Sequence, residues 1–122
     1  MSAHNVLQEL LIAPYEVLDP GTGQAIVVNR WNQHIGLTIA ASTAETNTLA
    51  APTQAGQRLS IIAMSVGGAG SRVVTVASAI DSSGHTTMTF DAVDEAVTLE
   101  AFPVGSDTYE WRVVFSSGMT AG

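Results

Sequence analysis

The sequence contains no cysteine, and all four of its basic residues other than histidine are arginines. Without cysteine there is neither a disulfide framework nor a thiolate metal site. The four arginines stand against eleven acidic residues, which gives a formal net charge of -7. A nucleic-acid surface needs clustered cations that displace counterions, and these arginines are widely separated in the sequence. We therefore expect no nucleic-acid partner.

Charged residues of either sign are scarce, at 12% of the sequence against 46% for apolar residues. This is about half the charged share of an average soluble protein. A surface with so few charges is easier to explain when other subunits cover part of it, so the composition favours an oligomer. A length of 122 residues suits one domain with a real core.

Long apolar runs are also lacking. Residues 6–13 are apolar except for Gln8 and Glu9, and no basic residue precedes them, so they do not read as a signal peptide. No later stretch approaches the roughly 20 apolar residues that span a bilayer. We therefore expect a soluble protein with no membrane partner.

The first fourteen residues differ from the rest of the chain. Leu7, Leu10 and Leu11 follow helical spacing, and Pro14 ends the pattern. The sequence Asp19-Pro20-Gly21 then predicts a tight turn, because proline presets φ and glycine accepts a positive φ. We expect a short N-terminal arm over residues 1–14 and one domain over residues 15–122.

After the turn, short β-rich runs are separated by small polar clusters. The predicted strands are 25–29, 35–40, 58–65, 72–77, 86–90, 96–102 and 108–115, with a short eighth run at 47–50. This pattern is typical of an all-β fold: a single small antiparallel sandwich or barrel, jelly-roll-like, behind the arm.

The last predicted strand has the clearest period of two. One face carries Tyr109, Trp111, Val113 and Phe115, and the other carries Glu110 and Arg112. Strands of this kind bury one face only, which favours antiparallel pairing over a parallel α/β sheet.

No cluster of residues has a spacing suited to catalysis or to metal binding. His4, His34 and His85 lie far apart in the sequence and read as surface residues. The segment with Asp91, Asp94 and Glu95 fits no EF-hand loop and reads as a solvated turn. The glycine-rich run 67–71 lacks the lysine of a phosphate loop and reads as a flexible hairpin loop. We therefore predict no enzymatic activity, no metal and no cofactor.

Aromatic residues leave one binding alternative open. Tyr15, Trp31, Tyr109 and Trp111 could stack on sugar rings, as in carbohydrate-binding modules. Trp111 lies in the most regular strand and is better placed in a core, whereas Trp31 reads as a surface residue. A carbohydrate- or receptor-binding β module is therefore an alternative functional hypothesis.

Several segments together give the chain a family resemblance. They are 19–21, 25–28, 44–53, 56–59, 86–91, 96–100 and 109–114. Over about residues 17–115 the sequence resembles small capsid-decoration (cement) proteins of tailed bacteriophages. These signatures are structural strand-and-turn patterns, and no catalytic residue is carried over with them.

The resemblance implies a virion structural protein that binds as a homotrimer on the outer surface of the head, near local threefold points, and stabilises the shell. Its expected partners are the major capsid protein, two further copies of itself and, as a further candidate, another decoration or fibre protein. The expected location is the exterior of the capsid in the virion, and the host cytoplasm during assembly.

Two sets of residues are candidates for contact with the capsid or a neighbouring subunit. In the arm they are Leu7, Leu10, Leu11 and Ile12, and in the domain Trp31, Arg58 and Arg112. The alternative for the arm is to pack on its own domain. The two arginines could form salt bridges between subunits or remain solvated.

Overall fold

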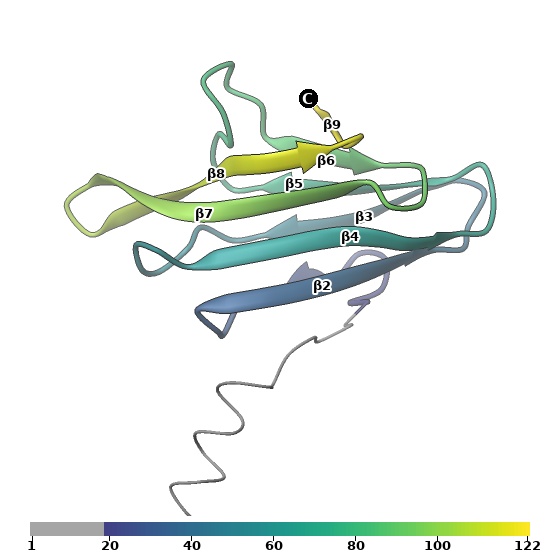
Figure 1. Cartoon of the computed structure of the whole chain (residues 1–122), viewed down its shortest axis with the longest axis horizontal. Coiled ribbons are helices and arrows are strands. Elements are labelled where there is room, and N and C mark those ends of the chain that lie inside the picture. Colours follow the sequence, from purple (N-terminus) through teal and green to yellow (C-terminus); the bar gives the residue numbers. More distant parts are fainter. Residues whose placement is uncertain (1–18) are drawn as a thin grey trace, which may run out of the picture.

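The computed structural model describes residues 19–122, which form nine β-strands in two sheets packed as a sandwich (Figure 1). The strands are β1 (Ala25–Ile26), β2 (Asn32–Ile39), β3 (Ala44–Leu49), β4 (Arg58–Val66), β5 (Ser71–Val76), β6 (Thr87–Phe90), β7 (Ala96–Gly105), β8 (Thr108–Ser117) and β9 (Thr120–Ala121). The all-β sandwich predicted from the sequence is confirmed. The predicted arm lies outside the described residues.

The nine strands are distributed between a five-stranded and a four-stranded sheet. One has five strands in the order β1-β3-β5-β6-β9, and the other has four in the order β2-β4-β7-β8. From β1 to β5 the chain alternates between the sheets. Two successive strands of the same sheet, such as β1 and β3, therefore run in the same direction. The pairs β1/β3, β3/β5 and β2/β4 are consequently parallel, and the other four pairs are antiparallel.

The prediction of a wholly antiparallel fold is therefore wrong for three strand pairs. Its basis was the alternation of apolar and polar residues along each strand. Alternation reports that one face is buried, and a sandwich buries one face of a strand whichever way the strand runs. The direction depends on the connections, and here they cross from one sheet to the other.

The connection between β4 and β5 illustrates this. Residues 67–70 join strands of different sheets, so the predicted hairpin loop is instead a crossover. A Cβ atom at Gly70 would lie 2.2 Å from the Ala41 carbonyl oxygen, so the chain can pass here only with glycine.

Seventeen buried apolar side chains fill the space between the sheets. Trp111 on β8 is fully buried among them, as the sequence predicted, and its Nε1 donates a hydrogen bond to the Ala50 carbonyl oxygen at 3.0 Å. This bond satisfies the one polar atom of a large apolar side chain. No helix long and apolar enough to cross a bilayer occurs in residues 19–122.

Candidate interaction surfaces

A change of register in β8 turns one large aromatic side chain out of the core. Val113 pairs with Leu99 on the neighbouring β7, but Phe115, two residues further, pairs with Thr98. Val114 is therefore an extra residue in the ladder, as in a β-bulge. Phe115 shares the outer face with Thr98 and is 57% exposed. The prediction of one aromatic face from Tyr109 to Phe115 thus fails after Val113.

Phe115 forms one wall of an open groove on the outer face of the four-stranded sheet, with a volume of about 590 Å³. Side chains that belong to the outer face of this sheet line it: His34, Gly36, Ser60, Ile62, Met64, Ala96, Thr98 and Phe115. We call this surface the outer groove. Its floor is low because Gly36, Ile62 and Ala96 form one row across three strands, and two of these residues are very small.

The outer groove is mainly apolar. The hydroxyl oxygens of Ser60 and Thr98 lie 3.1 Å apart and hydrogen-bond each other, so neither requires a partner from outside. Met64 is 52% exposed at the end of the groove diagonal to Phe115. An exposed apolar surface of this kind commonly marks a contact site.

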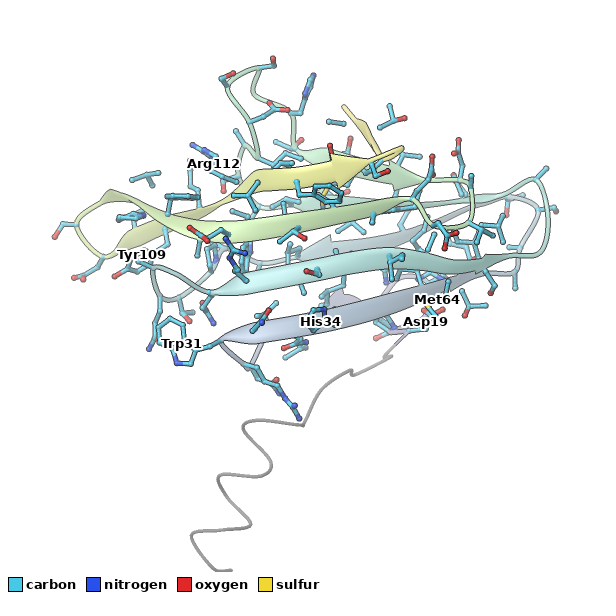
Figure 2. The ribbon with its side chains drawn as sticks, in the orientation of Figure 1. Asp19, Trp31, His34, Met64, Tyr109 and Arg112 are labelled. Carbon is cyan, nitrogen blue, oxygen red and sulfur yellow. The ribbon has the colours of Figure 1, made fainter. Side chains whose placement is uncertain are left out.

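A second apolar surface lies at one end of the sandwich. Its exposed side chains are Val27, Trp31, Phe102 and Val104. Backbone hydrogen bonds bring these segments together: Arg58 N donates to the Trp31 carbonyl oxygen, and Gly56 N to the Ala101 carbonyl oxygen. Figure 2 shows Trp31 and Tyr109 at this same end, opposite the end that carries Asp19 and Met64. We call this surface the Trp31 end.

Trp31 itself borders a small polar cleft of about 230 Å³. The cleft is lined by Val28, Asn29, Arg30, Trp31, Thr53, Gln54 and Gln57. Two buried glutamines fix its walls: Gln33 binds the backbone of Val27 and Asn29, and Gln57 accepts from the amides of Thr53 and Gln54. Trp31 is 60% exposed, which confirms its predicted surface placement.

The two arginines predicted as contact residues each have an acidic partner within the chain. Arg58 on β4 pairs with Glu100 on β7 at 2.8 Å, across neighbouring strands. Arg112 pairs with Glu110 at 2.6 Å and also donates to the Ala79 carbonyl oxygen. A salt bridge to another subunit would have to compete with these contacts, so an intersubunit role remains a prediction.

Within the described part of the chain, the histidines and carboxylates do not form a metal site. His34 borders the outer groove, while His85 lies in the turn before β6, where its Nδ1 is 2.7 Å from Asp81 Oδ2. The hydrogen bond with His85 is the main cause that holds the pKa of Asp81 below its ordinary value. His4 and Tyr15 lie outside the described residues. Within residues 19–122, no three histidine or acidic side chains are arranged to hold a metal ion.

The acidic segment before β7 is a turn, as predicted. The Glu95 carboxylate accepts hydrogen bonds from the amides of Asp91 and Ala92, at 2.6 and 3.0 Å. Asp94 adopts a φ of 70°, in the left-handed region that aspartate tolerates better than most residues. The side chain of Glu95 thus serves the local backbone.

Sequence reasoning missed a buried ionic cluster around Arg72 on β5. Arg72 is 1% exposed and donates hydrogen bonds to Asp19, Asn47, Glu45 and the Thr38 carbonyl oxygen. The available signal was an isolated arginine that alternates with Val74 and Val76 and so shares their apolar face of the strand. Because Thr38 belongs to β2 and Asn47 to β3, the cluster connects the two sheets at one edge.

Asp19 completes this cluster where the described chain begins. Burial opposes ionisation of its carboxyl group, but hydrogen bonds from Arg72, Gly21 N and Thr38 N, together with the charge of Arg72, outweigh burial. The pKa of Asp19 therefore lies below its ordinary value. The Thr38 amide donates to Asp19 Oδ2 at 2.8 Å, which fixes the chain beside β2.

No protein-family model matches this chain, and no curated protein matches it in sequence.

Proposed function

We propose that this protein is a capsid decoration protein, a virion structural protein that binds as a homotrimer to the outer surface of a tailed-phage head and stabilises the shell. The observation that carries the proposal is the Trp31 end, where four large apolar side chains from separate segments are exposed together. The homotrimer and its position on a phage head are what the resemblance to decoration proteins implies.

The Trp31 end has the character of a protein contact. Tryptophan is among the residues that contribute most to protein interfaces, especially where smaller apolar side chains surround it. Val27 precedes Trp31 by four residues in the sequence, and Phe102 and Val104 belong to β7 near its turn to β8.

In this proposal the major capsid protein and the other two copies of the chain are the partners, and the protein is not an enzyme. Among the described residues, His85 with Asp81 and Glu95 stabilise turns, and Asp19 belongs to the Arg72 cluster.

Two measurements test the proposal. Sedimentation equilibrium of the purified chain should give the mass of a trimer, and the protein should bind heads of its source phage that lack decoration. Trp31→Ala should weaken head binding at least about tenfold, the effect of losing one central aromatic contact. Thr75→Ala, on the exposed face of the other sheet, is the matched control. A monomer that binds no heads would overturn the proposal.

The Trp31 cleft favours one second candidate, a carbohydrate- or receptor-binding module of a phage fibre or tail. A flat exposed indole beside Asn29, Gln54 and Thr53 offers both a stacking face and hydrogen-bonding groups to a sugar. Glycan-array binding that disappears in Trp31→Ala, together with failure to bind heads, would favour this candidate over the first.

A further inference from the structure

We propose that the outer groove is the docking site for the chain's own N-terminal segment, residues 6–13, packed against the domain of the same subunit. This inference is independent of the proposed function, which uses the Trp31 end. It assigns one of the two placements that the sequence leaves open for the apolar residues Leu7, Leu10 and Leu11.

Asp19, to which the N-terminal segment is joined, lies near one end of the outer groove. Asp19 is held at the edge of the four-stranded sheet by the Thr38 amide and by Arg72. Thr38 follows Gly36 by two residues on β2 and pairs with Ser65, the neighbour of Met64. Figure 2 accordingly shows Asp19 and Met64 at the same end of the molecule, with His34 further along β2. The preceding segment therefore starts beside one end of the groove.

Residues 14–18 are long enough to connect Asp19 to a segment that lies in the groove. Residues 14–18 separate the segment from Asp19, and five extended residues span about 17 Å. The groove row that contains Gly36 is two residues from Thr38, about 7 Å, and the row that contains His34 is about 13 Å away. The linker can therefore place residues 6–13 over the groove of its own subunit without moving Asp19.

The dimensions of the groove match those of a short helix. A helix of eight residues is about 12 Å long and about 10 Å wide. From Met64 on β4 to Phe115 on β8, the groove extends across two strand spacings, about 10 Å, and along about four residues, about 13 Å. The small floor residues leave room for a helix between these two side chains. A helical stripe of Leu7, Leu10 and Leu11 would face the floor, while Gln8 and Glu9 face water.

Tethering favours this occupant over a separate molecule. The stripe and the groove are both apolar, and a linker of a few residues gives the segment an effective concentration in the millimolar range at its own groove. A second copy or another protein would have to displace it.

The absence of cysteine from the sequence makes a direct test available. The double variants Leu11→Cys with Met64→Cys and Leu7→Cys with Phe115→Cys place one thiol in the segment and one at an exposed position of the groove. The control is Leu11→Cys with Thr48→Cys, because Thr48 is exposed on the outer face of the other sheet. Mild oxidation is followed on a non-reducing gel at low protein concentration.

We expect both groove pairs to form a disulfide within one chain at least about ten times faster than the control pair, because docking raises the local thiol concentration. Circular dichroism of the reduced variants checks that each is folded. Disulfides that form mainly between chains would overturn docking on the same subunit. Equal rates in the groove and control pairs, or no disulfide in the groove pairs, would overturn the docking site itself.

Discussion

The outer faces of the two sheets differ sharply, although both belong to the same sandwich. The four-stranded sheet presents the outer groove with Ile62, Met64 and Phe115. The five-stranded sheet presents mainly threonines, with the half-buried Val73 in register between two of them. The threonines are Thr46, Thr48, Thr75, Thr87, Thr89 and Thr120. Thr48, Thr75 and Thr87 lie in one row across three strands. Threonine suits a strand and keeps its hydroxyl in water, so this face needs no cover.

This difference shows that the fold does not require an apolar outer face. The five-stranded sheet satisfies the same packing demand with its inner face alone, through residues such as Val74, Met88 and Phe90. The apolar residues of the outer groove are therefore surplus to the core. Their simplest physical role is contact with another apolar segment. The groove, and not the threonine face, is therefore the expected docking site for residues 6–13.

The largest effect should come from the inner face on which both outer faces depend. Leu99→Ala on β7 removes a fully buried side chain and should lower the free energy of unfolding by about 3 kcal/mol, within the range for such substitutions. Thr75→Ala, on the outer face of the other sheet, should change it by less than about 0.5 kcal/mol. Urea denaturation of both variants measures this, and equal losses would mean that the sheets are not packed as described.

The next effect concerns the edge at which the two sheets are tied together. Asp19→Asn removes one carboxylate from buried Arg72 and should lower the free energy of unfolding by about 2 kcal/mol at neutral pH, the scale of a hydrogen bond between charged groups. Glu45 remains as a second carboxylate partner, 3.4 Å from Arg72, which limits the loss.

The same variant predicts a pH dependence. The pKa of Asp19 is lowered from 3.8 in the folded protein, so its contribution is fully present above that pH and is lost as the pH falls through the depressed value. The difference between the wild type and Asp19→Asn should therefore be constant from pH 7 to pH 5 and shrink below about pH 4. A difference that grows on acidification would contradict the assigned ion pair.

A smaller effect tests the contrast between the outer faces directly. Phe115→Ser should destabilise the full chain by about 1 kcal/mol if the groove is occupied, because a partly buried apolar contact is lost. Thr87→Ser, half-buried on the threonine face, should cost less than about 0.5 kcal/mol. Repeating both in a chain without residues 1–13 should reduce the effect of Phe115→Ser to that of the control; an unchanged effect would leave the groove without its proposed occupant.

The smallest effect should come from the exposed ion pair on the four-stranded sheet. Arg58→Ala breaks its contact with Glu100 and should change the free energy of unfolding by less than about 1 kcal/mol, with the difference declining in high salt. Denaturation at low and high salt measures it. If head binding nevertheless falls in Arg58→Ala, the predicted contact role of this arginine is supported.

Local pattern predicted much of the fold. Eight of the nine strands overlap β-rich runs that polar clusters separate. The ninth, Thr120–Ala121, lies among small and polar residues and belongs to no such run. The core position of Trp111 and the surface position of Trp31 also followed from their neighbours in the chain. These features depend on residues close in sequence, which is why they were accessible.

The candidate surfaces were less predictable. Trp31 was identified, but Phe115 was placed on the wrong face because a single extra residue, Val114, reverses the alternation. Arg72 and Asp19 were not linked, since their 53-residue separation carries no local pattern. The parallel pairing of β2 with β4 likewise depends on a strand of the other sheet between them.

The sequence by itself therefore determined an all-β domain with its strands and buried tryptophan, because strand formation and burial follow from the alternation of neighbouring side chains. Only the tertiary structure decided which outer face is apolar, which arginine is buried and where Asp19 lies relative to the groove. Those features arise from register and crossover, which are set by contacts between strands distant in the sequence.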